Sequence, residues 1–520
     1  MKNAFSAFQH YLRVVILLAS ATFTLLREDP RGFALKLSER IRQGGVPCGQ
    51  HVVRLLELFG ETESRRRIAY LRERGDLSDA VKAGNTAKRS EQHQARRIAE
   101  EIEQLHRNIH PGRSLSPVRG EPRVLFVLTN SLPFTQSGYT LRSHETMLAL
   151  KARGIHVSAV TRLGYPVVTG RVPRRSADVV DGVKYARLLP LSLPKTLEGR
   201  NALAVEAVVD EARQNQATLL HTTTDFKNAI VTSEAAKILG IPWIYEVRGE
   251  LEKTWLSKRN RREQSAARHS EFYISARRQE TNAMKSASAV IVLSEVAQSN
   301  LIRRGVPEKK ITVVPNAVDS NLIGREYSRR AIREELGLDK QLFIAGTVTS
   351  VVDYEGLDYF VRALLLLPQV TGLIVGDGSA LPGLKRLVKE LGLSNRVIFA
   401  GRKPAEGIWK WYAALDVFVV PRKNTGVCKT VTPIKALTAQ ALGIPVVASD
   451  LPALREVTGG RAFYVAPESV RSLADGIVAA GESSGEYCER DWLLARTWES
   501  NGEKLASLYR GLHMNSESKE

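Results

Sequence analysis

LDVFVVPRKNTGVCKTVTPIKALTAQALGIPVVASDLPALRE, residues 415–456, contains the clearest alternation of strand and helix patterns in the chain. It contains an apolar run over 417–420 and a second apolar run over 445–448, both typical of buried strands. Between them the pattern predicts a helix over 432–442, which Gly443 ends. A strand, a loop, a helix and a strand in this order predict part of a doubly wound α/β fold with a parallel sheet.

The loop after the first of these strands is rich in cations. In an open parallel sheet, this loop and the following helix N-terminus lie at the carboxyl edge, where ligands bind and anions are favoured. Arg422, Lys423 and Lys429 lie in the loop, and Lys435 lies one turn into the helix. We therefore predict a phosphate-bearing ligand here, with Arg422 and Lys435 as the active cations and Lys429 as a binding residue.

Length and charge set the wider frame. A chain of 520 residues is too long for one ordinary core, so two or three domains are expected. The formal net charge of +20 indicates an anionic partner: nucleic acid, acidic lipid headgroups or phosphorylated ligands. The three cysteines show no metal-ligand spacing, and a reducing compartment fits them best.

The order of predicted strands and helices divides the chain into four segments. The two central segments each alternate strand and helix, which predicts two Rossmann-like domains that face a cleft. The C-terminal helices are expected to cross back over the junction. The segments are a helical basic extension (1–118), an N-terminal Rossmann-like acceptor domain (119–320), a C-terminal Rossmann-like donor domain (321–480), and crossover helices with a tail (481–520).

The N-terminal segment raises the question of a membrane. Residues 14–26 form an apolar run of 13 residues, shorter than the roughly 20 that a spanning helix needs. No small-residue cleavage site follows the run, which argues against a signal peptide. Two interpretations remain open: a helix packed in a small bundle, or a helix that lies in the membrane interface.

A cluster of arginines in the same segment has the same two kinds of explanation. Its members are Arg65, Arg66, Arg67, Arg72 and Arg74. They form either a solvated helix face or a patch that adheres to an anionic membrane surface, where each basic group contributes on the order of 1 kcal/mol. Little aromatic interleaving accompanies the cluster, so nucleic acid is not the expected partner.

The first Rossmann-like segment offers candidates for the acceptor side. Strands are predicted over 123–130 and 155–162. Gly138 follows the first strand, either as a plain turn residue or as a point where the backbone approaches a ligand. After a later strand, Arg248 lies among Glu246 and Glu250, and these side chains either bind an acceptor or form an ion-pair cluster.

The second Rossmann-like segment repeats the alternation. Strands are predicted over 342–350, 371–379 and 396–401. The loop GRKPAEG follows the third strand and begins with Gly401 and Arg402. Since this loop lies at the carboxyl end of a strand, we predict that it offers backbone groups to a nucleotide base.

Several phrases together resemble the family-4 glycosyltransferases of the GT-B fold. They are SLPFTQSGYTLRSHETMLAL (131–150), YEVRG (245–249), VVPNAVD (313–319), YEGLDYFVRAL (354–364) and IPVVASDLPALRE (444–456). The resemblance covers roughly residues 123–510, about three quarters of the chain. It implies transfer of a sugar from a nucleotide diphosphate sugar, with retention of configuration and without a divalent metal. Relatives of this kind make bacterial exopolysaccharides, capsules and glycolipids.

The resemblance also shows where this chain departs from the family. Most relatives place an Arg just after the first strand of the second domain, and a Lys before the Gly of the next helix. Thr347 and Glu355 stand at those places here. Arg422, Lys429 and Lys435 are the nearest replacements for the cations that, by the resemblance, neutralise the leaving diphosphate.

A second departure concerns two glutamates that relatives carry seven residues apart, one near the transferred sugar and one on the ribose. Thr430 and Thr438 occupy the matching positions and are our candidates for donor binding. Threonine lacks the charge-assisted bond to ribose, a difference of about 1 kcal/mol or more. At the place of the family's N-terminal histidine stands Arg248, with His221 as an alternative.

These observations lead to one main hypothesis and two alternatives. The main hypothesis is a retaining glycosyltransferase at the cytoplasmic face of the cell membrane, with a nucleotide diphosphate sugar as donor, a glycan or lipid-linked acceptor, and no metal or other cofactor. The first alternative is a catalytically weakened, glycosyltransferase-like partner or scaffold protein. The second, nucleic-acid binding driven by the +20 charge, predicts steeply salt-dependent binding to duplexes.

Overall fold

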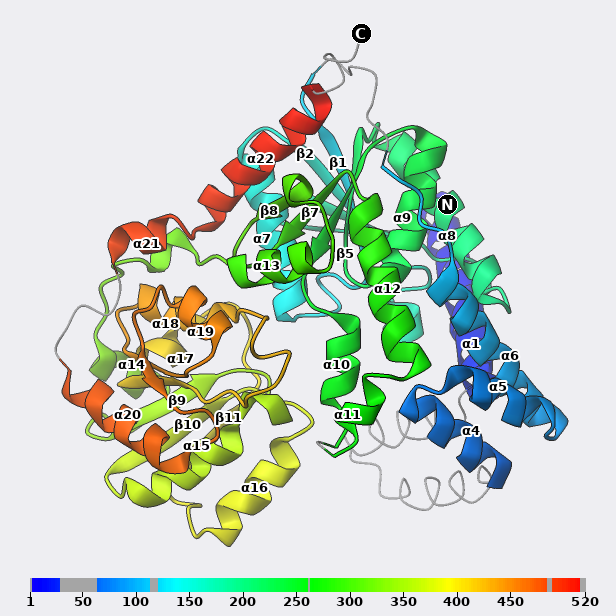
Figure 1. Cartoon of the computed structure of the whole chain (residues 1–520). Helices are drawn as coiled ribbons and strands as arrows, with labels where there is room; N and C mark the ends of the chain where they lie inside the picture. The colour runs from blue at the N-terminus through cyan, green and yellow to red at the C-terminus, as the bar shows by residue number, and fades with distance from the viewer. Residues whose placement is uncertain (1, 29–62, 113–119, 261, 484–488, 515–520) are drawn as a thin grey trace. The chain divides into compact units, whose positions relative to one another are not determined.

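The chain folds into two compact units, shown in Figure 1. The structure, a computed structural model, describes residues 2–28, 63–112, 120–260, 262–483 and 489–514. The units are Met1–Ile291 with Gly305–Lys310 and Ala506–Glu520, and Val292–Arg304 with Ile311–Leu505.

The first sheet has eight strands in the order β3-β4-β2-β1-β5-β6-β7-β8. Its strands are β1 (Arg123–Leu128), β2 (His156–Thr161), β3 (Ala177–Val180), β4 (Val183–Arg187), β5 (Leu219–Thr223), β6 (Trp243–Val247), β7 (Ala289–Val292) and β8 (Ile311–Val313). The pairings β4–β2, β2–β1, β1–β5 and β5–β6 are parallel, and β3 runs antiparallel to β4. Val124 of β1 is in register with Val157 of β2 and Leu219 of β5. Five of the six residues of β1 are buried, because a parallel strand is covered on both faces.

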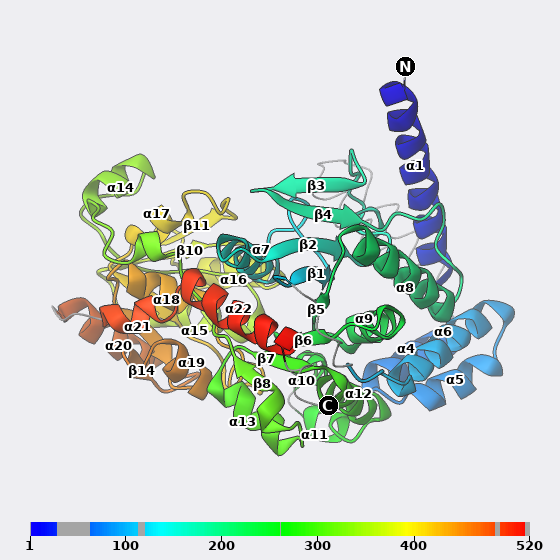
Figure 2. The same ribbon diagram turned by 90° about the horizontal axis from the view of Figure 1, so that it is seen from above.

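Helices cover both faces of this sheet. Figure 2 shows α7 on one face, and α8 and α9 on the other. The helices are α7 (Gly138–Ala152), α8 (Leu197–Gln214), α9 (Phe226–Leu239), α10 (Leu251–Ser257), α11 (Gln264–Ala267) and α12 (Glu271–Ser286). Helix α7 starts where Ser137 and Thr140 form a capping box, and α9 ends at Gly240, whose φ is +70°.

The described part of residues 1–118 is mainly helical. Its helices are α1 (Lys2–Glu28), α4 (Glu63–Arg74), α5 (Leu77–Asn85) and α6 (Arg89–His106). Helix α6 is tied to α12, where Gln279 Nε2 donates to the carbonyl of Gln104 over 3.2 Å. Residues 113–119, at the end of this segment and before β1, lie outside the described residues.

Three of the five arginines in the predicted cluster contact acidic side chains. Arg72 contacts Glu101 of α6 over 2.6 Å, and Arg65 contacts the buried Glu91 over 3.6 Å. Arg74 pairs with Asp76 over 3.1 Å. The contacts of Arg65 and Arg72 therefore link α4 to α6, and adhesion of the cluster to a membrane stays a prediction.

The second sheet has six strands in the order β11-β10-β9-β12-β13-β14, and its pairings are parallel. Its strands are β9 (Phe343–Val348), β10 (Val370–Val375), β11 (Val397–Gly401), β12 (Val417–Val420), β13 (Val446–Ser449) and β14 (Phe463–Val465). The helices of this part are α13 (Glu295–Arg303), α14 (Arg329–Glu335), α15 (Leu357–Ala363), α16 (Leu381–Glu390), α17 (Ile408–Ala413), α18 (Ile434–Ala441), α19 (Pro452–Val457), α20 (Val470–Glu482) and α21 (Arg490–Leu494). Helix α22 (Trp498–Met514) follows them. Short 3₁₀ turns are η1 (Val167–Thr169), η2 (Glu308–Lys310), η3 (Ser320–Leu322), η4 (Asp353–Glu355) and η5 (Leu364–Leu366).

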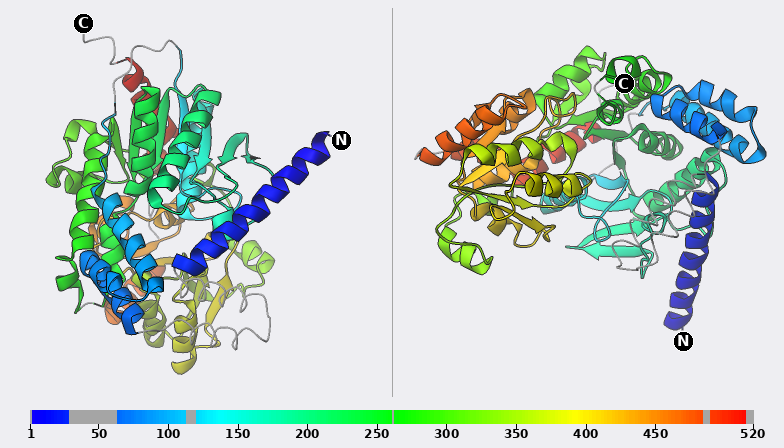
Figure 3. Two further views of the ribbon diagram at one scale, coloured as in Figure 1. Left: turned by 90° about the vertical axis from the view of Figure 1, so that its right-hand side faces the viewer. Right: turned by 90° about the horizontal axis from the view of Figure 1, so that it is seen from below.

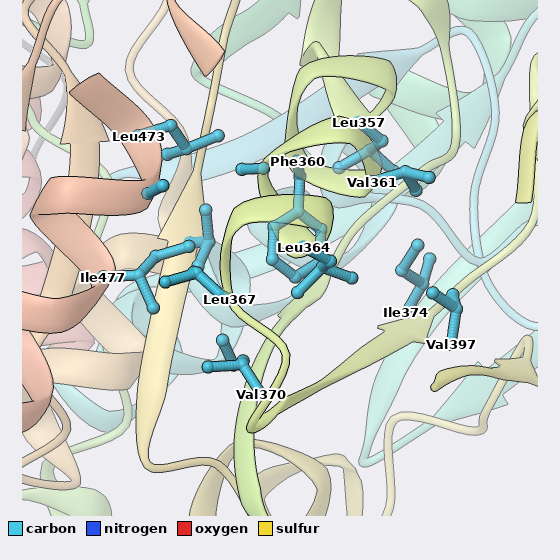
Figure 4. Close-up of a cluster of buried hydrophobic side chains, with 14 of the residues drawn as sticks. Leu357, Phe360, Val361, Leu364, Leu367, Val370, Ile374, Val397, Leu473 and Ile477 are labelled. Atoms are coloured by element: carbon cyan, nitrogen blue, oxygen red, sulfur yellow. The ribbon is translucent and has the colours of Figure 1, made fainter. Parts of the chain in front are cut away.

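Strand β12 shows why its sequence is apolar throughout. Val417 and Val419 belong to a core cluster with α15, α16 and α20, part of which Figure 4 shows. Phe418 and Val420 belong to a second cluster, with α17, α18 and α19. Successive side chains of a strand point to opposite faces, so a sheet with helices on both sides requires apolar residues at every position.

The prediction for residues 415–456 is confirmed to within two residues at each boundary. The predicted strand over 417–420 is β12, the predicted helix over 432–442 is α18, and the second predicted strand is β13. Helix α18 begins later than predicted because Pro433 has an extended backbone and serves as its N-cap. Among the helices of the described ranges, none is both long and apolar enough to cross a bilayer.

Candidate functional site

The loops after β9 and β12 meet at the carboxyl edge of the second sheet. Gly356 follows η4 with a φ of +70°, and a Cβ there would lie 1.9 Å from the carbonyl oxygen of Pro421. Only glycine permits this approach. The backbone N–H of Lys423 also donates to the carbonyl of Tyr354 over 3.0 Å. The approach places Glu355 beside the first residues after β12.

Glu355 contacts both cations that the sequence singles out. Arg422 donates through Nη2 to Oε1 of Glu355 over 3.0 Å and through Nε to Oε2 over 3.3 Å. Lys435 Nζ donates to Oε2 of Glu355, and to Oγ1 of Thr349 over 2.5 Å. The side chains of Glu355, Arg422 and Lys435 are only 6%, 7% and 11% exposed. Glu355 is 67 residues from Arg422 in the chain, so no local sequence pattern indicates this pairing.

The pKa values follow from burial and from the charges in contact. Burial alone raises the pKa of Glu355, but Lys435 and Arg422 outweigh it and lower that pKa to about 2. Burial lowers the pKa of Lys435 to about 8, against the opposing attraction of Glu355. Burial also opposes the charge of Arg422, yet the carboxylate of Glu355 raises its pKa. Near neutral pH the cluster thus contains two cations and one anion.

This arrangement retains capacity for an anion. The Arg422 guanidinium has five N–H donors, of which three bond Glu355 and the carbonyl of Val431. Lys435 has three donors, of which two bond Glu355 and Thr349. The remaining three N–H groups have no partner among the described residues. They lie beside the N-terminus of α18, where the helix dipole also favours negative charge.

The other predicted donor-side residues lie at the end of β11, in the loop after β12 and on α18. Lys429 and Arg402 are exposed. Gly401 ends β11 with a φ of +70°. Thr430 donates to the carbonyl of Gly426 over 3.2 Å, and the Thr438 hydroxyl hydrogen-bonds the buried Tyr412. Their roles in donor binding stay predictions.

Thr347 and Thr349 explain how the cluster differs from the family pattern. Thr347 lies inside β9 and is buried. Its side chain is uncharged, so it does not replace the arginine that relatives carry at this place. Thr349 lies just beyond β9 and accepts the bond from Lys435. Cys428 is buried in the same region, and burial raises the pKa of its thiol, which suits a packed residue rather than a nucleophile.

In the first unit, Arg248 belongs to a buried ion network. Glu246, 2% exposed, accepts from Arg248 Nε over 2.8 Å and from Arg142 Nε over 2.8 Å. Arg248 Nη1 donates to the carbonyl of Tyr139 over 2.8 Å and to Oγ of Ser143 over 2.7 Å. Burial raises the pKa of Glu246, but Arg248 and Arg142 together hold it well below its usual range.

The sequence left two roles open for Arg248, acceptor binding and an ion-pair cluster, and the structure contains the ion pairs. Its guanidinium joins the end of β6 to the first turn of α7 and is 6% exposed. Arg142 was not among the predicted residues, and its neighbours Leu141 and Ser143 give no local sign of a buried partner. Glu250 pairs instead with Lys253 over 2.5 Å. A catalytic role for Arg248 stays a prediction.

The remaining predicted residues of the first unit are Gly138 and His221. Gly138 is the first residue of α7, and a Cβ there would meet no described heavy atom within 4 Å. The space is open to a ligand. His221 is fully buried, stacks on Phe126 at 4.5 Å between ring centroids, and bonds the Tyr509 hydroxyl over 2.6 Å. Its Nε2 lies 3.6 Å from Oε2 of Glu246, and burial lowers its pKa against the opposing effect of that carboxylate.

Each unit is built on a mostly parallel sheet, and the second carries a cationic candidate site at the carboxyl edge of its sheet. This combination is typical of enzymes that use nucleotide sugars. The glycosyl transferases group 1 family matches residues 339–482. The glycosyl transferase 4-like domain matches residues 137–317. Together the two matches cover more than half of the chain. The chain belongs to the family-4 glycosyltransferases, and its units have the GT-B fold.

Individual relatives agree with this assignment. The chain is 32% identical over 181 residues to the lipopolysaccharide core biosynthesis mannosyltransferase LpsB of Rhizobium meliloti, with 32% of this chain and 50% of LpsB covered. It is 28% identical over 248 residues to a GDP-mannose-dependent alpha-(1-6)-phosphatidylinositol monomannoside mannosyltransferase of Mycolicibacterium smegmatis, with 43% and 63% covered. The matched regions thus span less than two thirds of these relatives.

Solved structures share the fold. The sucrose-phosphate synthase of Thermosynechococcus elongatus superposes with a TM-score of 0.60 at 22% identity, over 75% of this chain and 99% of that chain. Anabaena HepE in complex with UDP gives a TM-score of 0.51 at 21% identity, over 76% and 98%. At these identities the likeness shows the architecture alone.

Proposed function

We propose that the protein is a retaining glycosyltransferase that moves a sugar from a nucleotide diphosphate sugar to a glycan or lipid-linked acceptor. The observation that carries the proposal is the pair Arg422 and Lys435, which keep N–H donors uncommitted beside the N-terminus of α18. Relatives named for transfer to lipopolysaccharide core and to phosphatidylinositol mannoside support an acceptor of this class.

The proposed chemistry needs positive charge held in place beforehand. Cleavage of the sugar–phosphate bond develops negative charge on the departing diphosphate. In this proposal Arg422 and Lys435 meet that charge directly, and no divalent metal takes part. Both side chains are held by Glu355, so little reorganisation accompanies the reaction.

Nucleoside diphosphates provide the first test. We expect UDP or GDP to raise the melting temperature of the protein, because a ligand that binds only the folded state stabilises it by about 2.7 kcal/mol at 100 times Kd. Differential scanning fluorimetry with UDP, GDP and ADP measures this, followed by transfer assays with the corresponding sugars. If no nucleotide shifts the melting temperature, the non-catalytic partner role replaces the transferase.

We also propose that the protein binds peripherally to the inner face of the cell membrane, through α1. One side of α1 packs on the first unit, where Val14 and Leu17 contact Val167 and Leu189. The opposite side is apolar and exposed, with Phe23 69% exposed; its other members are Leu12, Val15 and Ile16. Figure 3 shows α1 along the outside of this unit. An interfacial helix presents such a face to lipid, and the exposed Arg13 is available to anionic headgroups.

Vesicle binding tests this second proposal. We expect the protein to sediment with vesicles of phosphatidylcholine and phosphatidylglycerol. A double variant with Ile16→Glu and Phe23→Glu should bind the vesicles roughly 10-fold or more weakly, because two apolar side chains no longer enter the interface. Val179→Glu is the matched control, since Val179 is 70% exposed on the edge strand β3. Equal sedimentation of the α1 variant and the control contradicts the proposal.

A further inference from the structure

Glu355 occupies the centre of the candidate site although an acid there opposes an anionic ligand. Its carboxylate accepts from Arg422 and from Lys435, which come from different elements. We propose that Glu355 is a positioning residue: it fixes both cations toward the diphosphate and keeps Lys435 protonated. The inference rests on the proposed function of Arg422 and Lys435, and it assigns a role to a residue that itself touches no substrate.

The backbone around Glu355 is held rigidly enough for this role. Gly356 passes so close to Pro421 that a side chain at position 356 is excluded. The sulfur of Cys428 donates to the carbonyl of Tyr354 over 3.5 Å. The neighbouring Lys423 N–H donates to the same carbonyl. These contacts join the loop after β9 to the loop after β12 and fix the backbone on both sides of Glu355. Its carboxylate is held in turn by the bonds from Arg422 and Lys435.

Lys435 depends on this carboxylate for its charge. Burial disfavours the ammonium group, and the positive charge of Arg422 disfavours it further. Glu355 favours the charged form. The thiol of Cys428 also faces this region, but burial raises its pKa, so it stays neutral near pH 7. Thr349 provides an acceptor without charge. Without Glu355, Lys435 loses its proton at lower pH.

A role for Glu355 in charge neutralisation alone predicts the opposite effect of its removal on anion binding. If the carboxylate only neutralised the two cations, its removal would expose more positive charge and tighten anion binding. Under the positioning role, removal of the carboxylate weakens anion binding, and the loss grows with pH as Lys435 deprotonates. The pH dependence therefore separates the two roles, and a merely structural defect does not reproduce it.

The first experiment measures Lys435 without any ligand. Competitive labelling with trace acetic anhydride, read by mass spectrometry of the peptide that contains Lys435, gives the apparent pKa of this one lysine. We expect a value near 8 in the natural protein and a value lower by about one unit or more in Glu355→Gln. Asp353→Asn is the matched control, because Asp353 lies on the same turn but pairs with Lys423 and is exposed.

The second experiment measures binding of GDP, UDP and inorganic pyrophosphate by calorimetry between about pH 6 and pH 9. We expect the natural protein to lose affinity above about pH 8, and Glu355→Gln to bind about 10-fold more weakly at neutral pH, with its loss shifted to lower pH. Glu355→Asp, which keeps the charge, should restore the natural profile in part. Lys435→Arg should remove the alkaline loss.

The outcomes are distinguishable. An unchanged labelling pKa of Lys435 in Glu355→Gln overturns the inference, and so does tighter binding of pyrophosphate by that variant. A shifted labelling pKa in a protein that binds none of the nucleotides supports the role of Glu355 at Lys435 and refutes the proposed function. If Glu355→Gln does not fold, as judged by its melting curve, the pH dependence of binding in Glu355→Asp and Lys435→Arg tests the inference instead. A Lys435→Arg protein that still loses affinity above about pH 8 overturns it.

Discussion

Replacement of Arg422 by alanine is expected to lower kcat/KM for sugar transfer, and affinity for the nucleoside diphosphate, by about 100-fold or more. Arg422 is 7% exposed and directs its guanidinium toward Glu355 and the carbonyl of Val431. Its loss removes a preorganised cation and leaves Glu355 with Lys435 alone. Calorimetry with UDP or GDP and initial-rate measurements with the preferred donor check the result.

Two further variants make this test specific. Arg422→Lys keeps the charge but loses the two-pronged contact with the carboxylate, so we expect an intermediate loss of about 10-fold. Lys389→Ala removes an exposed cation at the end of α16 in the same unit and should bind as the natural protein does. Natural affinity in a folded Arg422→Ala protein refutes the diphosphate site proposed above.

Replacement of Glu246 by alanine is expected to destabilise the first unit by about 3–5 kcal/mol. Glu246 lies between Arg142 and Arg248, and the three side chains are 2%, 3% and 6% exposed. Without the carboxylate, two buried guanidinium groups face each other with no counter-charge. The N–H groups that now bond Glu246 also lose their acceptor.

Hydrogen exchange read by mass spectrometry is the suitable measurement, since a chain of two units need not unfold in one step. We expect faster exchange in the peptides of β6 and α7, with those of the second unit unaffected. Glu121→Ala is the control: Glu121 and Arg510 form an ion pair over 2.9 Å, and both are about half exposed. Exposed pairs contribute about 1 kcal/mol or less. Similar exchange in both variants contradicts the prediction.

The architecture and the family could be predicted from the amino-acid sequence alone. The strand and helix of residues 415–456 could be predicted because apolar periodicity and proline or glycine boundaries act over a few neighbouring residues. The position of Arg422 at a strand's carboxyl end followed from the same local pattern. The phrases of the resemblance then identified the GT-B class.

The pairing of the buried charges could not be predicted and became known from the folded structure. Glu355 and Arg422 are 67 residues apart in the chain, and Arg142 and Glu246 are 104 apart. Sequence spacing contains no signal for such contacts, because they depend on how two loops or a helix and a strand pack. The exposed side of α1 was equally undetermined, since the run over 14–26 is apolar on all sides and only its packing on Val167 shows which face remains outside. Local patterns thus predict elements, whereas long-range packing sets the partner of every buried charge.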